Sequence, residues 1–147
     1  MSYSDLPEDW PERSLSEPGI ARDVLDLCVT DADRHRGGVS VLLCGPGGRL
    51  RQPVFLDGVP ADPDPSERRA TMDWATHACQ PLPEASDQRQ GSLLLALVRA
   101  EGGVCDDDRF WHQVALDACA EAGVELLGTY VVTLGGVHTL PTARRAA

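Results

Sequence analysis

The run Ser92–Val98, with the sequence SLLLALV, constrains the fold of this chain more than any other stretch. An uninterrupted apolar run of this length suits a β-strand that is covered on both faces, as strands inside an α/β sheet are. Gly102 and Gly103 interrupt the chain soon afterwards. The run therefore predicts a central strand with helices packed on both faces of its sheet.

The stretch after this run predicts a helix and then a hairpin. The Asp106-Asp107-Asp108 triplet suits a helix start, because carboxylates accept from free N–H groups and oppose the helix dipole. Gly123 suits a left-handed helix end. Val124–Leu134 then predicts a strand, and Val137–Leu140 a short strand that pairs back on it. The apolar side of the helix is expected to contain Phe110, Trp111, Val114, Ala115, Ala118, Cys119 and Ala122.

The first half of the chain predicts a helix followed by a hairpin. The helix is expected to start near Ser16 or Glu17, with Pro18 in its first turn. Its apolar side is expected to contain Ile20, Ala21, Val24, Leu25, Leu27 and Cys28. The polar stretch Thr30–Arg36 ends at two glycines. Val39–Cys44 and Leu50–Leu56 read as paired strands around the turn Gly45–Gly48, and Pro53 predicts an edge position for the second of them.

A further helix is predicted between this hairpin and the central strand. Asp64, Pro65 and Glu67 match the N-cap, N1 and N3 positions of a helix start. Its apolar side is expected to include Ala70, Trp74, Ala75, Ala78 and Cys79. The polar stretch Pro81–Gln90 is expected to form an exposed, mobile loop. The predicted order is thus α-β-β-α-β-α-β-β, which indicates a three-layer α/β sandwich around a mixed sheet.

Length and composition bound the class of protein. At 147 residues the chain is expected to form a single α/β domain over residues 16–147, preceded by an extended arm over residues 1–15. The formal net charge of −10 disfavours nucleic acid as a partner, because phosphate backbones require clustered cations. No apolar run approaches the length of a membrane span. The absence of Lys and Asn favours a GC-rich bacterial source.

Cysteine usage indicates a reducing compartment. Five cysteines occur at wide spacings behind an acidic, polar N-terminus that lacks the pattern of a signal peptide. We therefore expect a cytoplasmic protein with free thiols. Cys28, Cys79 and Cys119 fall on apolar helix sides, where small buried core residues are the favoured interpretation.

The element order, with a hairpin at each end, resembles the JAB/MPN metalloprotease-like fold, and its RadC-like branch in particular. This architecture is shared with cytidine deaminases. The resemblance covers about Val39 to Pro141 and includes the segment EAGVELLGTYVVTLGGVHTL. It implies a zinc site built from a His-x-His-Pro motif just after the central strand, from a following Ser and Asp, and from a glutamate in the earlier hairpin region that acts as general base.

The residues that this site needs are missing. The two histidines fall on Leu97 and Arg99 if Gly102 matches the glycine of the family, and on Val98 and Ala100 if Gly103 does. The Ser-x-x-Asp part is reduced to Cys105-x-x-Asp108. No glutamate lies between Glu17 and Glu67. The resemblance therefore implies a degenerate member with no catalytic residues, no zinc and no cofactor.

Other chemical sites are weaker. His77 and Cys79 lie two residues apart on a helix and should point to different sides, which disfavours a shared zinc. Gly45–Gly48 lacks the Lys-Ser/Thr and the helix of a phosphate loop. Cys105, Asp108 and His112 could form a relocated nucleophile site, since a helix start lowers a thiol pKa, but the neighbouring carboxylates oppose this. His138 is expected on the solvent side of an edge strand.

These observations favour a non-catalytic protein-interaction module over an enzyme. Its partner would be a protein, and association with further copies of the chain is left open. One alternative is a hydrolase with a relocated site near Cys105 and His112. The other is a small-ligand-binding domain with a pocket at the carboxyl end of Ser92–Val98, covered by the loop Glu101–Cys105.

Overall fold

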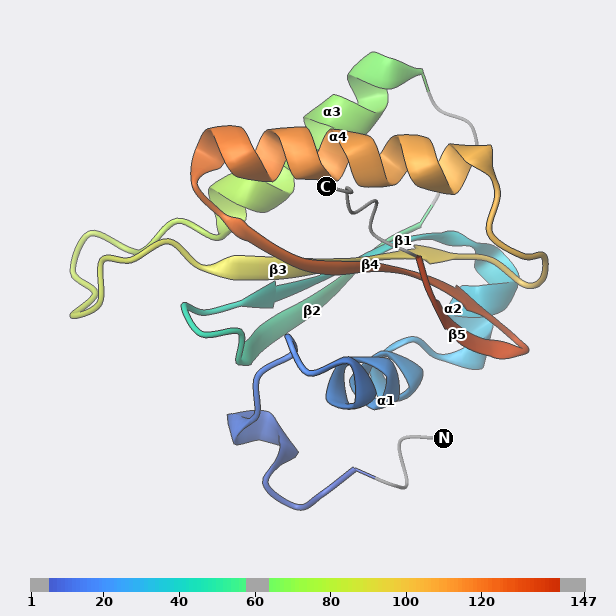
Figure 1. Ribbon diagram of the computed structural model, residues 1–147, viewed down its shortest axis with the longest axis horizontal. Coiled ribbons are helices and arrows are strands. Elements are labelled where there is room, and N and C mark those ends of the chain that lie inside the picture. Colours follow the sequence, from blue (N-terminus) through green and yellow to red (C-terminus); the bar gives the residue numbers. More distant parts are fainter. Residues whose placement is uncertain (1–5, 58–63, 141–147) are drawn as a thin grey trace, which may run out of the picture.

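One mixed β-sheet forms the centre of the molecule (Figure 1). The computed structural model describes residues 6–57 and 64–140, and within these ranges the sheet has five strands in the order β2-β1-β3-β4-β5. The strands β3 and β4 are parallel, and the other neighbouring pairs are antiparallel. Their bounds are Gly38–Cys44 for β1, Leu50–Asp57 for β2, Ser92–Val98 for β3, Glu125–Thr133 for β4 and Gly136–Thr139 for β5.

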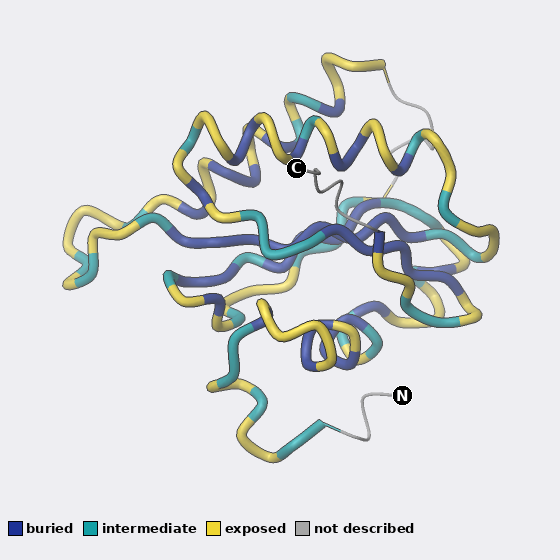
Figure 2. The backbone as a smooth tube through the Cα atoms, in the orientation of Figure 1, coloured by how far each residue is buried: buried dark blue, intermediate teal, exposed yellow. Residues whose placement is uncertain are grey.

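Helices cover both faces of this sheet. The helices α3 (Pro65–Ala78) and α4 (Asp106–Ala122) lie on one face, and α1 (Pro18–Cys28) lies on the other (Figure 1). Each face has its own apolar core, and the strands between them are the most deeply buried part of the chain (Figure 2). The prediction of an α/β fold with a mixed sheet is therefore confirmed.

The strand β3 is buried along its whole length, as its apolar run predicts. Because side chains alternate along a strand, its residues divide between the two cores. Leu94, Ala96 and Val98 pack with α1, whereas Leu93, Leu95 and Leu97 pack with α3 and α4. The predicted hairpins are also present, and β2 with Pro53 lies at an edge of the sheet.

The helix starts and ends agree closely with the local sequence signals. Pro18 stands at the start of α1, and Asp64 caps α3 by accepting from the backbone N–H of Glu67 at 3.0 Å. Gly123 ends α4 with φ of 71°, a left-handed conformation that glycine adopts without strain. Such signals depend on a few adjacent residues, which explains why the sequence alone reveals them.

The buried sides of the helices differ in part from the prediction. On α3, Ala75 and Cys79 are buried as expected, but Ala70, Trp74 and Ala78 are exposed. On α1 and α4, Leu27 and Phe110 are exposed, and Cys28 is only half-buried. The inward side of α3 instead contains Arg68, Met72, Ala75, Thr76 and Cys79. Arg68 can lie on this side because it contacts Asp107 and two aromatic rings of α4, which hydrophobicity along α3 does not reveal.

A short helix, which is not among the predicted elements, follows α1 within the polar stretch Thr30–Arg36. It is α2 (Asp31–Arg36), and Thr30 and Asp33 form a reciprocal capping box at its start. The Thr30 hydroxyl accepts from the Asp33 N–H at 3.1 Å, and the Asp33 carboxylate accepts from the Thr30 N–H at 3.4 Å. The spacing of these two residues was the available signal. The helix matters because its end leads Arg36 and Gly37 towards β3.

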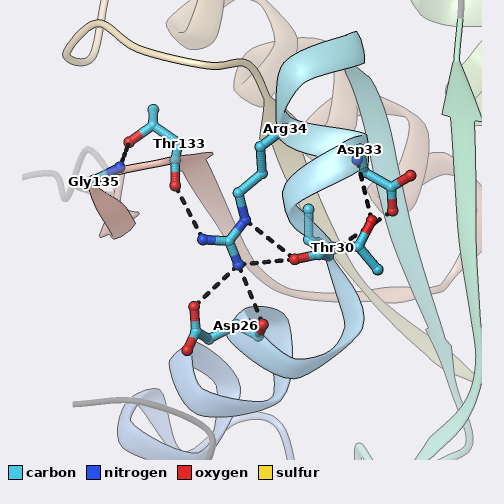
Figure 3. A network of polar contacts seen from close by, with 7 residues as sticks. Asp26, Thr30, Asp33, Arg34, Thr133 and Gly135 are labelled. Carbon is cyan, nitrogen blue, oxygen red and sulfur yellow. Dashed lines mark hydrogen bonds and ion pairs between the residues drawn. The ribbon is translucent and has the colours of Figure 1, made fainter.

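Arg34 anchors α2 to two distant parts of the fold (Figure 3). Its buried guanidinium donates to the carbonyl of Val29 and to both the carbonyl and the carboxylate of Asp26, at the end of α1. It also donates to the carbonyl of Thr133 at 3.1 Å, at the end of β4. One arginine thus donates to two carbonyls at the end of α1, where a helix lacks donors of its own for its last carbonyls.

The described part of the expected N-terminal arm, residues 6–15, lies against the α1 face of the sheet. It contains a 3-10 helix over Trp10–Glu12, and Trp10 packs partly against the core there. Leu15 is fully buried in that core, and its N–H donates to the carbonyl of Gly48 at 2.9 Å. The residues before position 6 lie outside the described ranges.

Candidate functional site

A pocket of about 280 Å³ opens at the carboxyl end of β3. Three segments form its walls: the end of α2 with the start of β1, the end of β3, and the first turns of α4. Leu97, Arg99, Cys105 and Asp108 all line it. The structure therefore brings together the positions that would hold the zinc site if Gly102 matches the glycine of the family. It also adds Arg36, Gly37 and Gly38, which no pattern in the sequence associated with this site.

An ion pair between Arg99 and Asp108 closes the inner side of this pocket. The guanidinium donates from both terminal nitrogens, each 2.7 Å from one oxygen of the Asp108 carboxylate. The second of these nitrogens also donates to the carbonyl of Gly103. The backbone N–H of Cys105 adds a further bond of 2.8 Å to the same carboxylate. Two-pronged pairs of this kind are among the strongest polar contacts in proteins.

The charges of this pair are stabilised by their surroundings. Burial by itself would raise the pKa of the Asp108 carboxyl, but the hydrogen bonds from Arg99 and Cys105 outweigh it and lower the pKa below its ordinary value. Hydrogen bonding to Asp108 raises the pKa of the Arg99 guanidinium. Asp108 is thus an ionised carboxylate with its oxygens engaged, which does not suit it to proton transfer or metal binding.

Each aspartate in the first turn of α4 is paired with an arginine. Asp108 binds Arg99, Asp107 accepts from Arg68 of α3 at 3.1 Å, and Asp106 accepts from Arg109 at 2.9 Å. The acidic triplet that the sequence analysis interpreted as a helix cap therefore has a second role. It holds positive side chains around the start of α4.

Arg68 is the most buried of these arginines, with 7% of its surface exposed. Its guanidinium lies over the rings of Phe110 and Trp111, at 5.5 and 6.0 Å from their centroids. Such cation–π contacts stabilise a desolvated arginine. Its Nε atom is buried and has no hydrogen-bond partner among the described residues.

Cys105 stands apart from the other cysteines, all of which lie in the described part of the chain. It is exposed at the N-cap of α4. Burial raises the pKa of the Cys44 and Cys119 thiols to about 12 and that of Cys79 to about 11. These three belong to the core, as proposed for Cys79 and Cys119 from the sequence.

The fold separates the residues of the suggested nucleophile site. Cys105 and His112 are seven residues apart along a helix, so about 10 Å of axial rise lies between them. His112 is buried, and its Nδ1 atom lies 2.7 Å from the hydroxyl of Thr129 on β4. The arrangement holds Cys105 next to Asp108, but it does not place His112 beside the thiol as a base.

The other histidines and possible ligands are dispersed. His77 is exposed whereas Cys79 is buried, so they face different sides of α3 as predicted. His138 is exposed on the edge strand β5, also as predicted. Within residues 6–57 and 64–140, no three His, Cys, Asp or Glu side chains lie close enough together to hold a metal ion.

His112 should make the stability of the protein depend on pH. Burial lowers its pKa below the ordinary value of 6.5, and its Nε2 atom has no partner among the described residues. The unfolded chain therefore binds this proton more readily than the folded chain does. We expect the free energy of unfolding to be greatest above about pH 6.5 and to fall as the pH is lowered towards 5.

Urea denaturation curves recorded about every half pH unit between pH 7.5 and 5 would measure how the free energy of unfolding changes with pH. His112→Asn should flatten this dependence, because the amide can replace the bond to Thr129 without taking up a proton. His77→Asn, at an exposed position on α3, is the matched control and should leave the slope unchanged. An equal slope in the His112→Asn variant would show that another group is responsible.

Comparison with known proteins adds no family to this description. No protein-family model matches the chain, and no curated protein or solved structure matches it either. In the described ranges, none of the helices combines the length and the apolar character needed to cross a membrane.

Proposed function

We propose that this chain is a non-catalytic protein-interaction module on a scaffold like that of the JAB/MPN metalloproteases, in its RadC-like branch. The observation that carries the proposal is the Arg99–Asp108 ion pair at the carboxyl end of β3. In the enzymes that the chain resembles, this end of the central strand holds zinc. Here an arginine provides the positive charge instead.

The register of β3 supports this interpretation. Leu97 lies in β3 and Arg99 directly follows its last residue, where the Arg99 N–H still donates to the Val132 carbonyl of β4 at 3.0 Å. Because this pairing continues the strand direction, side chains two residues apart leave the same face of the sheet. Leu97 belongs to the core beneath α4, which places that face towards the helix whose first turn holds Asp108. A histidine pair at these two positions would therefore face Asp108. The leucine and the arginine that replace it leave one carboxylate ligand, and that carboxylate is already bound.

The surface beside the pocket has the composition of a binding face. Phe110 is 55% exposed, and Arg109 precedes it on the open side of α4. Arginine and aromatic side chains dominate the binding energy of many protein interfaces. Arg68 supports the Phe110 ring from below, so this aromatic side chain is presented to a partner at little cost in side-chain entropy.

Metal analysis tests the proposal, and a double substitution sharpens it. The purified wild-type chain should contain far less than one zinc per molecule after exposure to zinc and desalting. Leu97→His/Arg99→His should take up about one zinc per chain, because two imidazoles and the released Asp108 carboxylate supply the three ligands of an open zinc site. The same double variant with Asp108→Ala is the matched control and should lose this zinc.

Two results would contradict the proposal in different ways. Stoichiometric zinc in the wild-type chain would exclude a degenerate site. A double-histidine variant that keeps its helical circular dichroism but binds no zinc would exclude the suggested correspondence between β3 and the metal-binding strand. The hydrolase alternative receives no support from the separation of Cys105 and His112, whereas the pocket favours the small-ligand alternative as a second candidate.

A further inference from the structure

Positive side chains gather around the pocket even though the whole chain carries a formal net charge of −10. Arg36 and Arg99 line it, and Arg68 binds Asp107, which also lines it. Asp107 and Asp108, the two carboxylates of the lining, are each bound by an arginine. The start of α4, a helix of 17 residues, adds the positive end of its dipole.

Arg36 is the arginine of this pocket that lacks a hydrogen-bonded carboxylate among the described residues. Arg36 is close to Asp33 and Asp57, but at 3.9 and 3.7 Å these ion pairs are too long to be hydrogen bonds. The N–H group of Asp107, which lines the pocket, lies in the first turn of α4, where a helix provides no acceptor of its own. An oxyanion in the pocket would give the Arg36 guanidinium the acceptor oxygens that it lacks at hydrogen-bond distance.

The remaining surface of the pocket is apolar. Val39 and Leu97 belong to the core on that face of the sheet and line the pocket, and the Trp111 ring lies beside them. A volume of about 280 Å³ is near the lower end of the range for ligand pockets, so an occupant would be small. The two kinds of surface together suit a molecule with one charged end.

We propose that this pocket binds a small ligand that has an oxyanion group, a carboxylate or a phosphate, on an apolar body. The oxyanion pairs with Arg36, whose side chain is 55% exposed and weakly held. Arg99 stays bound to Asp108 and shapes the inner wall. The apolar body lies against Val39, Leu97 and Trp111. This site goes beyond the proposed protein-interaction role, and its test measures ligand binding rather than metal content.

Benzoate, phenyl phosphate and benzamide form a set of probes that tests each part of the proposal. The first two share a phenyl ring with an oxyanion, whereas benzamide has the same shape as benzoate without the charge. Titration into the ¹⁵N-labelled wild-type chain, followed by NMR, should shift the Trp111 indole signal and the Gly37 and Gly38 amides. The stronger of benzoate and phenyl phosphate then identifies the kind of oxyanion that the pocket takes.

Substitution of Arg36 provides the decisive comparison. Because hydrogen bonds to charged groups are the stronger kind, Arg36→Gln should weaken benzoate or phenyl phosphate binding about tenfold or more. Arg89→Gln is the matched control, since Arg89 is exposed and lies in the loop before the opposite end of β3. It should leave binding unchanged.

Three outcomes would overturn the proposal. The first is the absence of shifts at about 10 mM probe, well above a Kd of about 1 mM. The second is equal binding of benzamide and benzoate, which would show that the negative charge of the ligand does not contribute to binding. The third is unchanged binding in Arg36→Gln. None of these results depends on metal content, so a failure here is distinct from a failure of the proposed function.

Discussion

Replacing Arg34 with methionine is expected to lower the free energy of unfolding by about 3–5 kcal/mol, because several buried carbonyls lose a charged donor and each such loss costs about 1–3 kcal/mol. The methionine fills a similar volume but donates nothing. The carbonyls of Asp26, Val29 and Thr133, which Arg34 joins, then stay buried without this donor (Figure 3). Urea unfolding at pH 7, followed by circular dichroism, measures the loss.

The controls for this prediction separate geometry from charge. Arg34→Lys keeps the charge but not the planar fork, so it should recover only part of the lost stability. Arg89→Met removes an exposed ion pair with Asp87 and should cost about 1 kcal/mol or less. If Arg34→Met were as stable as Arg89→Met, the network in Figure 3 would not anchor α2.

Truncation of Trp111 is the second change with a large expected effect. This side chain is 3% exposed and packs in the core between the sheet and the helices α3 and α4. Trp111→Ala should cost about 3–5 kcal/mol, the usual range for an aromatic side chain removed from a core. That is a large part of the total stability of a small domain, which is about 5–15 kcal/mol.

Thermal and urea unfolding would measure the cost, and a second tryptophan provides the comparison. Trp74 on α3 is 43% exposed, so Trp74→Ala should cost about 1 kcal/mol or less. An unchanged midpoint for Trp111→Ala would contradict the packing described here. Part of the loss is expected to come from Arg68, because its guanidinium would lose one of the two rings on which it lies.

One part of the candidate site could be predicted from the sequence, and the other part could not. Arg99, Cys105 and Asp108 lie on one continuous strand-loop-helix segment, so a motif comparison could place them near one another. Arg36 and Arg68 come from separate elements, and no local pattern connects them with that segment. They reach the site because β1 pairs beside β3 and because α3 packs across α4.

The residues that start and end helices could be recognised from the sequence alone. Pro18, Asp64 and Gly123 act through the few peptide groups next to them, and the uncharged run of β3 can be buried only between two layers. The helix starts and ends are local effects, whereas the apolar run of β3 indicates two covering layers without saying which helices form them.

Only the tertiary structure decided which side of a helix is buried and which charges meet. On α3, Trp74 is more hydrophobic than Arg68, yet Trp74 faces solvent and Arg68 is buried. The arginine has Asp107 and two aromatic rings on α4 to receive it, and these contacts offset the cost of removing its charge from water. Which side chains of a helix are buried depends on the residues that other elements place against them, and local sequence patterns do not reveal these contacts.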